Sequence, residues 1–156
     1  MKNVNEKTID YFNSVIGKLN KSSLVTLVER VSRYTVIIRV NSKEAEVVAK
    51  AIIERAKALN LPLKTITGDN GTEFADHKRI AEKLGIDFYF THPYSSWEKG
   101  TNENTNGLIR QYFPKGTDFN HISEEAVSLV ENELNNRPRK CLNFKKPADI
   151  LAQIRE

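Results

Sequence analysis

The sequence predicts an α/β fold with one mixed five-stranded sheet and helices on both of its faces. Two observations lead to this prediction. The first third of the chain reads as three β-type runs with short polar breaks, which is typical of an antiparallel meander. The rest alternates strand patterns with helical patterns and ends in helices, and this order fits a mixed sheet covered by helices.

Length and composition fit one soluble domain. The chain has 156 residues, enough to bury a proper core, so we expect residues 1–156 to form a single domain. The content of 39% hydrophobic and 28% charged residues is ordinary for a globular protein, and no apolar run approaches a membrane span. No signal peptide is visible at the start. The single Cys141 allows neither an internal disulfide nor a cysteine-based zinc site, and it indicates a reducing environment.

The first helix is expected after the three strands. Asn41 is the expected N-cap, with Glu44 three residues later as its capping-box partner. Asn60 and Pro62 should end the helix. Its apolar stripe is expected to contain Ala45, Val48, Ala49, Ile52, Ala56 and Leu59.

The other elements follow from dense β-branched runs and from capping residues. Gly85 should stop a short helix, Ser123 should cap a later helix, and Pro147 suits the first turn of a final helix. The resulting order, β-β-β-α-β-α-β-α-α, is that of a ribonuclease H-like fold. The expected strands are Thr8–Gly17, Leu24–Val28, Tyr34–Ile38, Leu63–Thr67 and Asp87–Thr91, and the expected later helices are Lys78–Leu84 and Asn102–Tyr112.

Two acidic residues carry the chemistry that the sequence indicates. Asp69 closes a β-type run, and Glu103 lies 34 positions later on a predicted helix. Carboxylates from a strand end and a helix can converge on two divalent metal ions that drive phosphoryl transfer. Taken singly, Asp69 reads more readily as a turn residue, and Glu103 as an exposed helix residue.

The wider sequence around both residues resembles the DDE transposases and retroviral-type integrase cores, and most closely the IS-thirty family of bacterial insertion-sequence transposases. The resemblance covers about residues 15 to 151. It implies a ribonuclease H-like core that cuts and joins DNA with Mg²⁺ or Mn²⁺, and Asp69 and Glu103 correspond to its second and third acidic residues. The matching stretches are LVTLVER at 24–30, SRY at 32–34, DNGTEF at 69–74, residues 92–119 with GTNENTNGLIRQYFPKG at 100–116, and LNNRPRKCL at 134–142.

The first acidic residue of the family is missing. The family places it two residues before a Val-Ile-Gly sequence, and here that position is Asn13. An amide oxygen can coordinate a metal but brings no negative charge, so we expect impaired metal binding. Asp10 lies three residues away, so on a regular strand it should face the opposite side, and it could replace the ligand only if the strand were bulged or shifted.

The resemblance also implies partners and a setting. The expected partner is DNA, at element ends and at the target, with a homodimer as a fair expectation from related cores. The expected location is the bacterial cytoplasm, in association with the nucleoid. The family has an N-terminal helix-turn-helix region, and nothing of that kind precedes Met1, so we expect a fragment or a truncated gene product.

The net charge of +4 is weak evidence for DNA binding on its own, but the basic residues are concentrated after position 99. Each of these residues could contact DNA or could simply be a solvated residue of a helix or turn. For Lys99 and for the Arg137–Lys140 turn, the two interpretations are about equally strong. Trp97 reads more readily as a packing residue than as a stacking one. The candidate DNA contacts are Lys99, Asn102, Asn106, Arg110, Arg137 and Arg139.

The sequence therefore leaves two hypotheses. The first is a catalytic core that uses Asp69 and Glu103 and is impaired by Asn13. The second is a catalytically inactive DNA-binding or interaction module derived from such a core.

Overall fold

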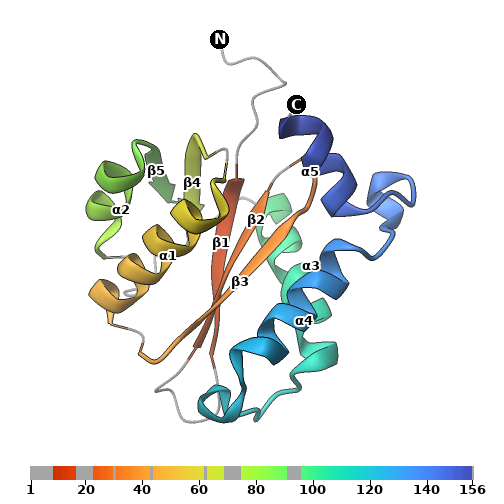
Figure 1. Ribbon diagram of the computed structural model, residues 1–156, viewed down its shortest axis with the longest axis horizontal. Helices are drawn as coiled ribbons and strands as arrows, with labels where there is room; N and C mark the ends of the chain where they lie inside the picture. Colours follow the sequence, from red (N-terminus) through yellow and green to blue (C-terminus); the bar gives the residue numbers. More distant parts are fainter. Residues whose placement is uncertain are drawn as a thin grey trace.

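The described part of the chain forms a five-stranded sheet in the computed structural model (Figure 1). The spatial order is β3-β2-β1-β4-β5, with β1 antiparallel to β2, β2 antiparallel to β3, and β1, β4 and β5 parallel. The expected mixed sheet is therefore confirmed. The strands are β1 (Ile9–Ile16), β2 (Ser23–Glu29), β3 (Thr35–Val40), β4 (Thr65–Gly68) and β5 (Asp87–Phe90).

The structure describes the backbone of residues 9–16, 23–29, 31–42, 44–61, 63–68, 75–90 and 96–155. It describes the side chains of residues 24–29, 31–42, 44–61, 63–68, 75–90 and 104–153. The helical elements in these ranges are α1 (Ala45–Leu59), α2 (His77–Leu84), α3 (Ser96–Tyr112), η2 (Phe119–His121), α4 (Glu124–Asn135), η3 (Lys140–Leu142) and α5 (Pro147–Arg155).

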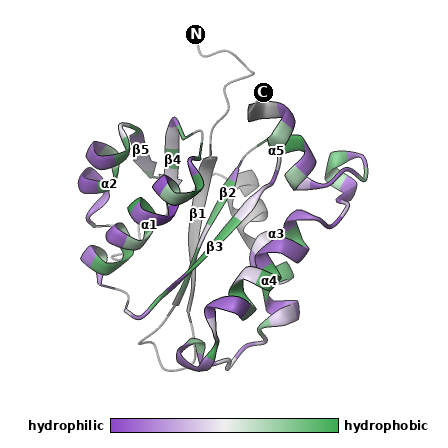
Figure 2. Cartoon of the chain, in the orientation of Figure 1, coloured by the Kyte–Doolittle hydropathy of each residue, from purple (hydrophilic) through white to green (hydrophobic). Residues whose placement is uncertain are grey.

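Helices cover both faces of the sheet, as the sequence predicts (Figure 1). Strand residues alternate between two cores because successive side chains point to opposite faces. Val25 and Leu27 of β2 pack with α1 and α2, whereas Leu24 packs with α3 and α4. Figure 2 shows hydrophilic and hydrophobic residues alternating along α1, α2 and α4, as expected for helices with one buried side. No helix in the described ranges is long and apolar enough to cross a membrane.

Three of the expected caps are confirmed. Asn60 and Gly85 end α1 and α2 in the left-handed conformation, and the Ser123 side chain accepts a hydrogen bond from the Ala126 N–H at the start of α4. The expected Asn41 cap is wrong, because α1 begins at Ala45 with Glu44 as its N-cap residue. The Asn41 side chain instead accepts a hydrogen bond from Arg39 at 3.5 Å.

Helix α3 begins at Ser96, earlier than the expected Asn102. The Gly and Asn residues near its start are weak helix formers, and for that reason the sequence favours a loop there. Tertiary packing overrides this preference: Thr105, Ile109 and Phe113 follow one another at helical spacing and are all buried. The packed second half of the helix anchors its polar first half.

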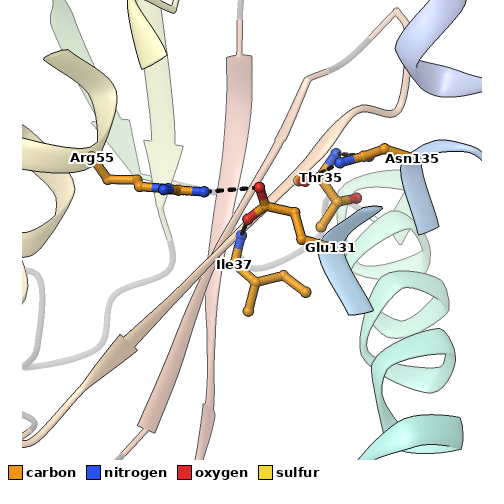
Figure 3. Close-up of polar contacts among 5 residues, drawn as sticks. All are labelled: Thr35, Ile37, Arg55, Glu131 and Asn135. Carbon is orange, nitrogen blue, oxygen red and sulfur yellow. Dashed lines mark hydrogen bonds and ion pairs between the residues drawn. The ribbon is translucent and has the colours of Figure 1, made fainter. Parts of the chain in front are cut away.

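Polar side chains of α4 cover the outer edge of β3 (Figure 3). The Asn135 amide accepts a hydrogen bond from the Thr35 N–H at 2.8 Å and donates one to the Thr35 carbonyl at 2.7 Å. Glu131 accepts a hydrogen bond from the Ile37 N–H at 2.8 Å. Four residues along a helix span about 6 Å and two residues along a strand span about 6.8 Å, so this spacing lets one helix satisfy alternate groups of an edge strand. We call these residues, together with Arg55, the β3 clamp.

Arg55 joins α1 to the β3 clamp from the other face of the sheet, with its guanidinium 2.9 Å from the Glu131 carboxylate (Figure 3). Burial raises the pKa of Glu131, and the bonds from Ile37 and Arg55 only partly offset that effect. The clamp therefore connects helices on opposite faces around an edge that would otherwise present unpaired backbone groups.

Candidate functional site

The centre of the sheet brings the Asn13 position next to the end of β4. In the parallel pairing of β1 with β4, Phe12 lies opposite Gly68, the last residue of β4. Asn13 and Asp69 are the next residues of the two strands in the sequence. On its other side, Asn13 pairs with Thr26 of β2. Asp69 itself lies outside the described residues, and so does the side chain of Asn13.

Strand β1 carries an irregularity at Asp10. Ile9 pairs with Glu29 and Tyr11 pairs with Val28, so β1 has one more residue than β2 across this step. An extra residue interrupts the alternation of faces along a strand. Because β1 is irregular at this step, Asp10 need not face away from Asn13 as it would on a regular strand. The side chain of Asp10 lies outside the described residues.

Helix α3 has two distinct sides. Thr105, Ile109 and Phe113 are 5%, 0% and 8% exposed and hold the helix against the sheet. At about 100° per residue, positions 99, 103, 106 and 110 fall within about 60° of one another and roughly 60–120° from Ile109, the middle of the buried side. The helix thus places the positions of Lys99, Glu103, Asn106 and Arg110 together on a side next to the buried one, where Asn106 and Arg110 are half-buried. For Lys99, Asn102 and Glu103 only the backbone is described.

Asn106 and Arg110 differ in what they already contact. The buried side-chain oxygen of Asn106 has no hydrogen-bond partner among the described residues, so it retains an acceptor for a ligand. The Arg110 guanidinium donates to the carbonyls of Phe113 and Pro114, both at 3.4 Å, and lies 5.9 Å from the centre of the Phe119 ring. Arg110 therefore supports the end of α3, and a DNA contact would have to compete with these bonds.

Gly107 lies on α3 between Asn106 and Arg110. A Cβ atom at this position would meet nothing within 4 Å. Glycine in a helix interior costs roughly 0.5–1 kcal/mol relative to alanine, and here no internal packing requires it. The absent side chain leaves room for close approach of a ligand one turn after Glu103.

Arg137 and Arg139 lie just after α4. Arg137 is exposed, and its guanidinium donates to the Gln111 side chain of α3 at 3.3 Å. Burial lowers the pKa of Arg139; the Cys141 thiol partly offsets this effect, and the charges of Arg33 and Arg137 reinforce it. The Arg137 contact joins this basic region to the helix that carries Glu103.

The side chains that the structure describes contain no cluster of three or more acidic, His or Cys residues suited to a metal ion. The positions that the sequence assigns to metal binding, Asp69 and Glu103, are not among those side chains. Sequence reasoning also gave no role to Phe144, which is 70% exposed. The basic residues on both sides of Asn143-Phe144 could have indicated a functional role for this aromatic residue.

Residues 8–96 match the family described as the integrase core domain. A transposase for insertion sequence element IS4351 from Bacteroides fragilis is 46% identical to the chain over 142 residues, which is 91% of the chain and 44% of the transposase. Transposase InsI for insertion sequence element IS30A from Escherichia coli is 44% identical over 88% of the chain and 36% of the transposase. The chain thus spans less than half the length of these relatives.

The fold is similar to that of the catalytic core domain of BIV integrase. The TM-score is 0.71 at 20% sequence identity, covering 92% of both chains. A chain of the simian T-cell lymphotropic virus intasome gives a TM-score of 0.68 at 18% identity, covering 92% of the present chain. At these identities the likeness shows the ribonuclease H-like fold.

Proposed function

This chain belongs to the integrase core domain family, and on that premise we propose that it is the core of a DNA transposase whose metal site is impaired by Asn13. The observation that carries the proposal is the register of β1 with β4, in which Phe12 pairs with Gly68. This pairing supports a site where Asn13 and Asp69 meet at the centre of the sheet, and the packing of α3 against β1 supports the addition of Glu103. The relatives named above are transposases, and cutting and joining DNA is the corresponding activity.

Asp69 and Glu103 would hold Mg²⁺ or Mn²⁺. These are hard cations that prefer oxygen ligands, and two carboxylates with an amide oxygen form a compatible donor set. The bound metal would activate an attacking oxygen and stabilise a leaving oxygen of the DNA backbone. The unpartnered oxygen of Asn106, three positions after Glu103, would be a further acceptor for a water or for a DNA hydroxyl.

Asn13 removes one negative charge from this donor set. A site for two divalent ions must hold them against their mutual repulsion, and each missing anion lowers the affinity for the second ion. The chain as written is therefore proposed to have little activity.

DNA would lie along the side of α3 that carries Glu103 and reach the turn after α4. Phosphate contacts are expected from Lys and Arg, because these residues neutralise the backbone without reading its sequence. The proposed partners are element ends and target DNA, and the proposed assembly is a homodimer. The proposed contacts are Lys99, Asn102, Asn106, Arg110, Arg137 and Arg139.

A second candidate function is a catalytically inactive DNA-binding module. Asn13 favours this function, because replacing a carboxylate by an amide of the same size preserves the fold and removes a charge that catalysis needs. The two functions share the DNA surface and differ only in metal-dependent cleavage.

Nicking of pre-cut element-end DNA in Mn²⁺ separates these functions. We expect the chain as written to nick poorly, Asn13→Asp to gain activity because it restores the charge at nearly constant volume, and Asp10→Asn to have no effect. If the chain as written nicks DNA and Asp10→Asn abolishes this, the irregular β1 strand supplies Asp10 as the ligand and our assignment is wrong. If Asn13→Asp gains nothing although it still binds DNA, the inactive module is the better description.

A further inference from the structure

The segment Arg137–Lys146, which we call the basic loop, is the most strongly charged short stretch that the structure describes after α4. Its ten residues include five cationic side chains and no acidic one. None of the five makes an ion pair with a described carboxylate, and Arg137 donates a hydrogen bond to the neutral Gln111 side chain. The positive charge of the loop is therefore available to an anionic ligand.

The backbone of the basic loop is closed on itself. The Arg139 carbonyl accepts hydrogen bonds from the N–H groups of Leu142 at 3.0 Å and Phe144 at 2.8 Å. The Arg139 N–H donates to the Lys145 carbonyl at 3.0 Å, forming an isolated antiparallel bridge. These bonds fix the position of Phe144 relative to the cations on either side.

Phe144 has two features that cost free energy. Its backbone lies in the left-handed region at φ 64°, directly after Asn143 at φ 54°. A bulky residue in this region is a genuine outlier, and such outliers cluster at functional sites. Its side chain is 70% exposed, although aromatic rings are normally packed. Neither feature is explained by packing among the residues that the structure describes.

We infer that the basic loop binds unpaired DNA, with the Phe144 ring stacked on a base and the surrounding Lys and Arg residues on phosphates. This inference rests on the proposed function. An aromatic ring beside cations is the arrangement that binds single strands, because every base has a face for stacking and every nucleotide has a phosphate. A base inside a duplex is stacked on both sides, so the ring would discriminate in favour of frayed or cut ends.

The basic loop lies within reach of the proposed site. Arg137 contacts Gln111, which is eight positions after Glu103 on the same helix. Eight residues of helix span about 12 Å, which corresponds to roughly three to four base pairs of DNA. A strand held at the metal site could therefore extend to the loop after a few nucleotides.

The test compares a fluorescently labelled oligo-dT of 16 nucleotides with a blunt duplex of 16 base pairs, by anisotropy at 50 mM NaCl. Phe144→Ala should weaken binding of the single strand about 5- to 100-fold, the effect expected for the loss of one stacked base, and should change duplex binding less than about twofold. Phe144→Tyr should retain single-strand binding, because it keeps the ring. Leu129→Ala removes another exposed apolar side chain, on α4, and should change neither affinity.

Phe144→Gly is a control for strain, because glycine adopts the left-handed conformation freely and also lacks the ring. If the ring alone matters, Phe144→Gly should bind DNA as Phe144→Ala does. Equal losses on both DNAs, or no loss on either, would overturn the inference and leave the proposed function standing. A chain that binds neither DNA would overturn both. A change in sedimentation of Phe144→Ala without a change in DNA affinity would show that Phe144 contacts a second copy of the chain.

Discussion

The β3 clamp and the basic loop both contain polar side chains, but only those of the clamp are paired with one another and with the backbone of the sheet. In the clamp, the Glu131 and Asn135 side chains are buried and bond directly to the backbone of β3. In the basic loop, the cations have no carboxylate partner among the described residues, and the neighbouring aromatic ring is exposed. Polar groups with internal partners support the architecture, and polar groups without them mark a binding surface. Substitutions in the clamp should therefore change stability, and substitutions in the loop should change DNA affinity.

The largest effect is expected at Glu131. Glu131→Ala leaves the buried Ile37 N–H without an acceptor and Arg55 without its carboxylate, so the free energy of unfolding should fall by about 2–3 kcal/mol. Glu131→Gln keeps an acceptor for the Ile37 N–H, so its free energy of unfolding should fall by less than that of Glu131→Ala. Urea denaturation measures both. A loss under about 0.5 kcal/mol for Glu131→Ala would mean that the clamp does not stabilise the sheet edge.

The second prediction concerns pH. The pKa of Glu131 is raised above 4.5 in the folded state, so the folded protein binds this proton more tightly than the unfolded chain does. The corresponding stability is present below pH 4.5 and is lost as the pH rises through the folded pKa. The chain as written should therefore lose stability relative to Glu131→Gln between about pH 5 and 8.

Arg55→Ala should steepen this loss, because it removes the positive charge that favours ionised Glu131. Unfolding free energies of the three proteins at the two pH values test the prediction. A chain that gains stability relative to Glu131→Gln on going to pH 8 would contradict the direction of the pKa shift.

The third prediction concerns Arg137, which belongs to the basic loop. Arg137→Ala should reduce duplex affinity about threefold to tenfold and flatten the log–log salt slope by roughly one unit. Its unfolding free energy should stay within about 0.5 kcal/mol of the original. Lys50→Ala removes an exposed charge from α1, on the other face of the sheet, and serves as the control. If Arg137→Ala and Lys50→Ala reduce duplex affinity equally, the chain attracts DNA through its net charge and has no defined DNA surface.

The smallest effect is expected at Gly107. Gly107→Ala should raise the unfolding free energy by roughly 0.5–1 kcal/mol, because the helix gains a better residue and the added methyl group meets nothing within 4 Å. Thermal denaturation measures this change. A lower melting temperature would show that the helix is constrained at Gly107 by contacts outside the described residues.

The sequence predicted the five strands in chain order, the mixed sheet and three helix caps, because hydrophobic periodicity and capping chemistry are local signals. It did not predict the clamp, since Glu131 and Asn135 are polar. Their positions nevertheless continue the buried series of α4, which contains Val127, Val130, Glu131, Leu134 and Asn135. Polar residues at the spacing of an apolar stripe are the sign of a buried polar contact, but the partner is remote in sequence.

The start of α3 and the irregularity in β1 could not be predicted from local sequence patterns either. Packing of Ile109 and Phe113 extends α3 through weak helix formers. The extra residue at Asp10 arises from pairing with β2, which no local pattern reveals. The candidate site was predicted from motifs, and its common centre stays a prediction, because Asp69 and the side chains of Asn13 and Glu103 lie outside the described residues.

The most direct test of that common centre is Mn²⁺ affinity, measured by electron paramagnetic resonance of the unbound ion. Asn13→Asp should bind Mn²⁺ at least about tenfold more tightly than the chain as written, because it adds a carboxylate to the site. The gain should vanish when Asn13→Asp is combined with Asp69→Asn or with Glu103→Gln, since residues that share a ligand are coupled. A gain that persists in both double variants would show that Asn13 does not share a metal site with Asp69 and Glu103.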